Sequence, residues 1–339
     1  MMPDLPNITL CSRVPMMVVH QPSGKAHAPA RIARTKRSAL ATIVTAIGLA
    51  FVAPLAASSE TLTIAYPPAN DFLPAFVAKD MGFFAKRNLD VTLNVERVSN
   101  NIPAALVGGA ADIGGVPPTV LLLSREGGLD LVNIRGISRH TREHPTIALI
   151  AGKDSNIHTA DDLRGKKVGV PGLYGGLDVM ARAWVKSKGV PTTAVTWVEV
   201  PFPQMEAFLS RGSVDAVAAI EPFRSRLIAD GAGYKLTDYV SDLRGDLLLI
   251  GYTTTRSWAM SHRDTIARFN AAILEGEQYI AANPDQATAI EAKYLGFAGP
   301  RARFSATATA DDYRFYANAM LDLGVLKKPA DVSGILFAP

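Results

Sequence analysis

The chain has almost no cysteine: Cys11 is the single one in 339 residues. No intramolecular disulfide can form, so the fold must be stabilised by hydrophobic cores. The scarcity also excludes Fe–S clusters and zinc sites built on several cysteines. We therefore look for function among the other polar and aromatic side chains.

Long apolar runs are also missing, and the longest, residues 39–53 (ALATIVTAIGLAFVA), falls short of the ~20 residues that span a bilayer. Four basic residues between positions 31 and 37 precede it, and Pro54 and small residues follow. This order predicts a cleavable signal peptide, with residues 1–57 as leader and cleavage between Ala57 and Glu60. The mature protein is then periplasmic. An uncut membrane anchor, and a translation start at Met16 or Met17, stay open as alternatives.

Excess positive charge is absent from the predicted mature chain. The whole chain has a net charge of +4. Residues 1–57 hold six of its 35 basic residues and one of its 31 acidic residues, which leaves 29 basic and 30 acidic residues, a net charge of −1. A nucleic-acid partner would require a basic surface on the folded domain, so we expect none. Cys11 leaves with the leader.

What is present is an alternation of short β-rich runs with helical stretches, typical of α/β proteins with largely parallel sheets. Beyond residue 254 the periodicity is helical. Two β/α halves and a helical tail predict crossings between halves near residues 146–152 and 251–255. The β-rich runs are residues 61–66, 91–97, 111–114, 131–137, 146–150, 167–170, 195–199, 216–219 and 247–253. The main helical stretches are residues 73–87, 104–107, 177–188, 264–282, 284–294 and 311–323.

Gly, Asn, Ser and aromatic residues cluster where predicted strands end and helices begin. Ligands of α/β proteins bind at such places, because helix N-termini present unpaired N–H groups there. An ordinary turn is the alternative for each loop. The loops are residues 66–72, 99–101, 114–119, 171–176, 201–204 and 220–223.

One enzyme motif is present, His140-x-x-Glu143-His144, which matches an inverted zinc-peptidase pattern. That motif needs a helix, whereas a predicted strand precedes it and Pro145 follows. We therefore expect no enzyme and keep a zinc-dependent hydrolase as the alternative, while Arg139 or His140 could still reach an anionic ligand. G-x-S-x-G and Walker A motifs are absent, and no G-x-G-x-x-G stands in a strand-to-helix setting.

Four segments in order resemble a known family: residues 61–94 (TLTIAYPPANDFLPAFVAKDMGFFAKRNLDVTLN), 102–118 (IPAALVGGAADIGGVPP), 159–176 (TADDLRGKKVGVPGLYGG) and 205–223 (MEAFLSRGSVDAVAAIEPF). They look like the substrate-binding proteins of ABC importers for nitrate, taurine, aliphatic sulfonates and thiamine-pyrimidine precursors. The resemblance covers nearly all of residues 60–300. Some relatives synthesise the thiamine pyrimidine with a cysteine-rich motif, which the predicted mature chain, without Cys11, cannot do.

This resemblance implies a two-lobed α/β fold of the periplasmic-binding-protein (Venus-flytrap) type, with the ligand cleft at the hinge. Residues 60–150 and 253–339 would form lobe I, and residues 151–252 lobe II. A monomer without cofactor or bound metal would deliver its ligand to an ABC permease in the inner membrane. The implied ligand-binding residues are Asn70, Phe72, Ser99, Asn100, Gly115, Val116, Pro117, Gly172, Tyr174, Gly175 and Glu221.

The fourth loop departs from the family pattern. Sulfonate and taurine binders commonly carry Ser or Thr and a His there, whereas this chain has Leu173, Tyr174, Gly175 and Gly176. We therefore expect a small organic anion, a sulfonate or carboxylate, with an apolar or aromatic body. A pyrimidine or thiamine precursor and nitrate are the alternatives. Glu221 lacks a partner acid or nucleophile nearby in sequence, so ligand binding and helix capping are weighed equally for it.

Overall fold

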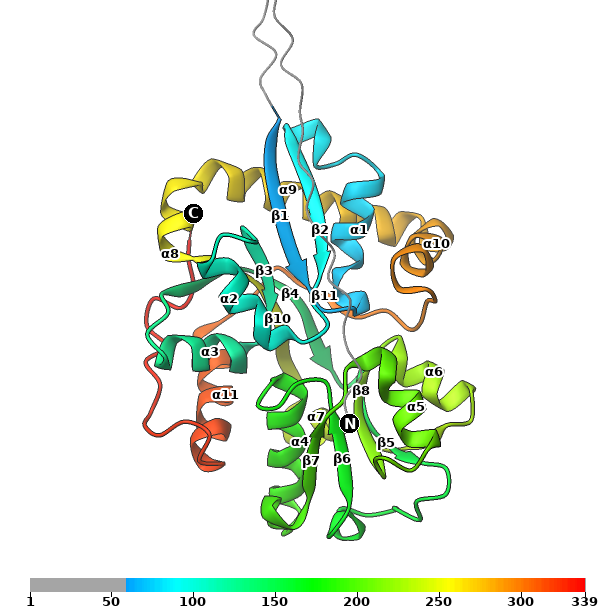
Figure 1. Cartoon of the computed structure of the whole chain (residues 1–339). Helices are drawn as coiled ribbons and strands as arrows, with labels where there is room; N and C mark the ends of the chain where they lie inside the picture. Colours follow the sequence, from blue (N-terminus) through cyan, green and yellow to red (C-terminus); the bar gives the residue numbers. More distant parts are fainter. Residues whose placement is uncertain (1–58, 339) are drawn as a thin grey trace, which may run out of the picture. The chain divides into compact units, whose positions relative to one another are not determined.

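The computed structural model describes residues 59–338, so Cys11 and the predicted leader lie outside the described part. Within that part no helix combines the length and the apolar character that a membrane span requires. The described residues form one compact unit with two β-sheets and helices packed around them (Figure 1).

The first sheet has six strands in the order β11-β4-β10-β3-β1-β2. β1 pairs in parallel with β2 and β3, while β10 is antiparallel to β3 and β4, and β11 is antiparallel to β4. The strands are β1 (Glu60–Tyr66), β2 (Leu89–Val95), β3 (Ile113–Val116), β4 (Leu131–Thr141), β10 (Asp246–Thr255) and β11 (Arg303–Phe304).

The second sheet has five strands in the order β7-β6-β8-β5-β9. β6 is parallel to β7 and β8, and β5 is antiparallel to β8 and β9. The strands are β5 (Ile147–Gly152), β6 (Lys167–Val170), β7 (Thr196–Glu199), β8 (Ala216–Ile220) and β9 (Gly233–Thr237).

Both sheets are therefore mixed, which corrects the prediction of largely parallel sheets. The chain leaves the first sheet after β4, enters the second sheet in β5 and returns to the first sheet in β10. Neither connection is a βαβ crossover, the link that parallel neighbours need, and β10 runs antiparallel to β4 and β5 antiparallel to β8. The predicted lobe limits at residues 150 and 253 fall inside β5 and β10. All of β5 pairs within the second sheet and all of β10 within the first, so the chain changes sheets between residues 141 and 147 and between residues 237 and 246.

Helices cover both sheets, and Figure 1 shows α1, α9 and α10 beside β1 and β2. A Cβ on Gly276 of α9 would lie 2.4 Å from the Pro74 carbonyl oxygen, so only glycine permits the close contact with α1. The helices are α1 (Leu73–Asp80), α2 (Ile102–Val107), α3 (Pro118–Glu126), α4 (Gly176–Ser187), α5 (Met205–Ser210), α6 (Phe223–Ala229), α7 (Tyr239–Leu243), α8 (Arg256–Ser261), α9 (Arg263–Ala282), α10 (Pro284–Leu295) and α11 (Ala310–Asp322).

Each of the nine predicted β-rich runs contains a strand, and β9 and β11 were not predicted. The helix predicted over residues 73–87 ends as α-helix at Asp80, because Gly82 has a φ of +72°, which a right-handed helix cannot continue. The fold thus brings the loops that follow β1, β2, β3, β6, β7 and β8 to the region described next.

Candidate functional site

A cavity with an accessible volume of about 50 Å³ lies among loops that follow strands of both sheets. From the first sheet the lining includes Pro67, Ala69, Asp71, Arg97, Ser99 and Pro117. From the second sheet it includes Pro171, Gly172, Gly175, Gly176, Phe202 and Ile220. The remaining walls are apolar except for one hydroxyl: Ile147, Leu177, Met180, Val240, Leu249, Ile250 and Tyr316.

The loop after β6 is held against the loop after β2. Asn100 Nδ2 donates to the carbonyl oxygen of Leu173 at 2.7 Å. A Cβ on Gly172 would lie 3.2 Å from Asn100 Oδ1, so glycine allows this approach. Gly175 precedes the first residue of α4 in an extended conformation. The N-terminus of a twelve-residue helix, with its partial positive charge, therefore opens on the cavity.

Arg97 is the cationic group of the cavity lining. It follows β2 by two residues and is exposed, and among residues 59–338 it has neither an ion pair nor a side-chain hydrogen bond. Ser99 lines the same cavity. A guanidinium, a hydroxyl and a helix N-terminus together are suited to bind an anionic group. Sequence reasoning missed Arg97, although it stands at the end of a predicted strand.

Asp71 is the acidic group of the lining, and it is buried. Its Oδ1 accepts a hydrogen bond from Ser138 of β4. Burial raises the pKa of the Asp71 carboxyl, although the Ser138 bond opposes that shift. The raised pKa means that this carboxyl takes up a proton more readily than an exposed aspartate does. In its ionised form it can accept a hydrogen bond from a ligand. Sequence reasoning missed Asp71 too, because its neighbours Asn70 and Phe72 were favoured.

Four of the eleven predicted binding residues line the cavity: Ser99, Pro117, Gly172 and Gly175. Asn100 touches the loop that forms its wall. The structure places the other six elsewhere, and they are Asn70, Phe72, Gly115, Val116, Tyr174 and Glu221.

Four of these six face the interior of the fold. Asn70 Nδ2 donates to Glu291 Oε1 at 3.2 Å and to the Pro300 carbonyl oxygen at 2.8 Å, so it anchors the segment after α10. Phe72 is fully buried against Gly115, where an added Cβ would lie 2.1 Å from the ring. Val116 is fully buried in the core as well.

Tyr174 points outward. Its side chain is 45% exposed, and the guanidinium carbon of Arg182 lies 5.3 Å from the ring centroid. Its φ of +62° belongs to the turn that leads into α4, in which the Tyr174 N–H donates to Asp178 Oδ2 at 2.6 Å. In this structure the ring that suggested an aromatic ligand lies away from the cavity.

Glu221 is buried and bound to the start of α6. Ser225 donates to it twice, through Oγ at 2.9 Å and through the backbone N–H at 3.2 Å, and Arg224 lies 3.7 Å away. Burial raises the pKa of the Glu221 carboxyl despite these contacts. Ligand binding and helix capping were the two roles predicted for Glu221, and its contacts with Ser225 are those of a helix cap.

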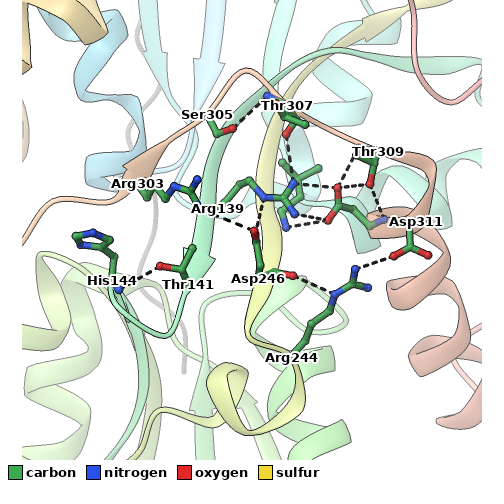
Figure 2. A network of polar contacts seen from close by, with 12 residues as sticks. Arg139, Thr141, His144, Arg244, Asp246, Arg303, Ser305, Thr307, Thr309 and Asp311 are labelled. Atoms are coloured by element: carbon green, nitrogen blue, oxygen red, sulfur yellow. Dashed lines mark hydrogen bonds and ion pairs between the residues drawn. The ribbon is translucent and has the colours of Figure 1, made fainter.

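Arg139 is enclosed by carboxylates, as Figure 2 shows. Its Nε donates to Asp246 Oδ1 at 2.6 Å, and its terminal nitrogens donate to Asp312 at 2.8 and 3.0 Å. The cluster ties β4 and β10 to α11. Arg139 therefore has internal partners and does not line the cavity.

His140 is buried in β4, and its Nε2 lies 2.7 Å from Ser241 Oγ. Burial lowers the pKa of His140 to about 4. Glu143 and His144 follow in a turn, where the His144 N–H donates to Thr141 Oγ1 (Figure 2). The motif thus lacks the helix that aligns two imidazoles. Over residues 59–338 no three His, Cys, Asp or Glu side chains gather as a metal site would require.

Comparison with known proteins adds the family. A model of the NMT1/THI5-like family matches residues 69–287, more than half of the chain. The bicarbonate transport ATP-binding protein CmpC of Synechocystis sp. is 28% identical over 65% of this chain and 35% of its own length. The riboflavin-binding protein RibY of Chloroflexus aurantiacus is 23% identical over 69% of this chain and 66% of its own length. The chain therefore spans under two thirds of these relatives.

Among solved structures, the periplasmic aliphatic sulphonate binding protein SsuA from Escherichia coli matches with a TM-score of 0.68 and 20% identity. The match covers 82% of this chain and 97% of that one. The predicted family resemblance and the predicted two-lobed α/β fold are confirmed by these matches.

Proposed function

We propose, since the chain belongs to the NMT1/THI5-like family, that it is an extracytoplasmic solute-binding protein that delivers a small organic anion to an ABC importer. Proteins named for bicarbonate transport, riboflavin binding and sulphonate binding are similar to it, which supports a binding role. The predicted signal peptide, outside the described residues, supports a periplasmic location.

The observation that carries this proposal is the composition of the cavity. Arg97, Ser99 and the N-terminus of α4 supply positive charge and donors, and most other walls are apolar. Such a site holds an anionic group by charge-assisted hydrogen bonds and buries an attached carbon body. Among residues 59–338 no nucleophile paired with a base lines the cavity, which supports a chain that binds its ligand and releases it unchanged.

In this proposal, closure of the two lobes on the ligand prepares its transfer to the permease. The loops of the two sheets meet around the cavity, and β4, β5 and β10 carry the chain between the sheets. Ala151 and Tyr252, where the sequence placed the hinge, are paired inside β5 and β10, so we expect bending at the two crossings instead, near residues 142–146 and 238–245. Bending there would bring the lobes together on the ligand and form the face that the permease contacts. Small-angle scattering profiles with and without a tight ligand should differ, and superimposable profiles would exclude closure.

A thermal-shift screen tests the ligand class. Sulfonates, aromatic carboxylates, pyrimidines and nitrate are added to residues 58–339 of the chain and to its Arg97→Ala variant. A ligand at about 100 times its dissociation constant should add about 2.7 kcal/mol of stability to the unmodified chain and far less to the variant. If nitrate stabilises both and no organic acid stabilises either, the proposed ligand class is wrong.

A second candidate ligand, a heterocycle with N–H donors such as a pyrimidine, is favoured by Asp71. A buried carboxyl in the cavity can accept a hydrogen bond from such a ligand. The pH dependence separates the two classes. Because the pKa of Asp71 is raised, a sulfonate should bind more tightly as falling pH protonates the carboxyl, whereas a neutral N–H donor should bind more tightly as rising pH ionises it.

A further inference from the structure

A second cavity, of about 320 Å³, adjoins the first, and Phe202 lines both. Neighbouring residues of the loop after β1 also divide between them, since Pro67 lines the first cavity and Pro68 the second. The second cavity is several times larger than the first. The two together therefore offer a small compartment that holds Arg97 and Ser99 beside a larger one.

Aromatic side chains form a large part of the wall of the larger compartment. Five aromatic side chains line it: Tyr66, Phe202, Phe223, Tyr294 and Phe297. Phe202 and Phe223 stack with ring centroids 5.4 Å apart, and Phe223 meets Phe297 edge to face at 5.2 Å. Rings arranged in this way present faces and edges to which a further aromatic ring can pack.

Few polar groups of this compartment are free to hold a charged ligand. Tyr294 Oη donates to Asp80 at 2.8 Å. Arg226 lies 3.7 Å from Glu206 and 3.1 Å from Asp230, and its guanidinium carbon is 4.7 Å from the Phe297 centroid. The charges of the lining are therefore already paired, which leaves apolar contact as the main interaction available to a ligand.

We propose that this aromatic cavity is a second compartment of the ligand site and takes a two-ring aromatic body whose anionic group sits in the first cavity. The inference rests on the proposed function, because it assumes that an anion is bound at Arg97. A cavity of about 150 Å³ holds one benzene ring, so 320 Å³ has room for two fused rings. The first cavity, at about 50 Å³, is too small for one benzene ring and has room for the anionic group with at most a short carbon chain.

The test compares two pairs of probes, and the members of each pair share an anionic group and differ in their body: methanesulfonate with naphthalene-2-sulfonate, and acetate with 2-naphthoate. Dissociation constants are measured by calorimetry on residues 58–339. We expect each naphthyl compound to bind at least tenfold more tightly than its methyl counterpart.

A variant that fills the second cavity tests whether the tighter binding of the naphthyl probes comes from contacts in that cavity. Val95 lines that cavity and is 52% exposed, so Val95→Trp adds an indole without crowding the core. We expect the variant to lose the tenfold gain and to bind the methyl probes as before. Val107→Trp is the matched control, because Val107 is 53% exposed and lines neither cavity; it should bind all four probes like the unmodified chain.

The outcomes separate the two proposals. If methyl and naphthyl probes bind equally, or if Val95→Trp and Val107→Trp behave alike, the second compartment is wrong and the anion site stands. If none of the four probes binds, the proposed anion site itself is wrong, and the two-compartment site falls with it.

Discussion

Two arginines near strands of the first sheet show contrasting uses of the same side chain. Arg139 donates to Asp246 and Asp312 and is nearly buried, whereas Arg97 lines the cavity and has no partner among the described residues. A buried cation with carboxylate partners stabilises the fold. A cation without partners at a cavity remains available to a ligand, and the predictions below test this division of roles.

The largest expected effect is on stability, from Arg139→Ala. The variant leaves Asp312 buried without its cation, and loss of one partner of a buried ion pair costs about 3–5 kcal/mol. Urea unfolding of residues 58–339 measures this loss. The control is Arg303→Ala, because Arg303 is exposed and lies 3.8 Å from Asp246, a pair worth about 1 kcal/mol or less. Equal losses for both variants would contradict the structural role of Arg139.

Arg97→Ala should have the reverse profile. We expect stability to change by no more than about 0.5 kcal/mol, since an exposed side chain without partners is removed. Affinity for the anionic probe that binds best should fall roughly tenfold or more, because a hydrogen bond to a charged group contributes about 1.5–3 kcal/mol. Calorimetry measures the change. Unchanged affinity would remove Arg97 from the site.

Two buried carboxyls extend the contrast to pH. Burial dominates at Asp71 and raises its pKa. At Asp312 burial also opposes ionisation, but hydrogen bonds from Arg139 and Thr309 outweigh it and lower the pKa. The Asp71 contribution to stability is therefore lost as pH rises from about 4 through its raised pKa, and the Asp312 contribution is lost as pH falls below about 4.

Urea titrations at several pH values check these signs. Relative to the unmodified chain, Asp71→Asn should gain stability as pH rises from 4 to 7. Asp312→Asn should be less stable than the unmodified chain at pH 7, and the gap should narrow as pH falls below 4. If the stability difference from the unmodified chain changed with pH in the same direction for both variants, the two carboxyl environments would not differ as described.

The smallest effect is expected from Tyr174→Gly. Glycine relieves the positive φ at this position, which costs other residues about 1 kcal/mol, and the variant loses a contact with Arg182 worth about 0.5–1 kcal/mol. The two terms nearly cancel, so stability and probe affinity should stay within about 0.5 kcal/mol and twofold of the unmodified chain. A tenfold loss of affinity would restore Tyr174 as a binding residue.

Sequence patterns predicted the strands that precede the cavity loops, and only some of the side chains that line the cavity. Ser99, Pro117, Gly172 and Gly175, from the loops after β2, β3 and β6, line it as predicted binding residues, and their role in binding stays a prediction. Asp71 was missed beside the predicted Asn70 and Phe72. The three residues form one turn of 3-10 helix, in which neighbouring side chains point in different directions, and the sequence carries no signal for which of them faces the cavity.

The sequence by itself determined the α/β class, the loops at which strands end and the family, because alternation of apolar runs and turn residues is local information. The tertiary structure decided which charges are available. Arg97 and Arg139 look alike in the sequence, and they differ because Asp246 and Asp312, more than 100 positions away, fold onto Arg139. Phe202 came to line both cavities in the same way, through packing between loops of the two sheets that local patterns do not specify.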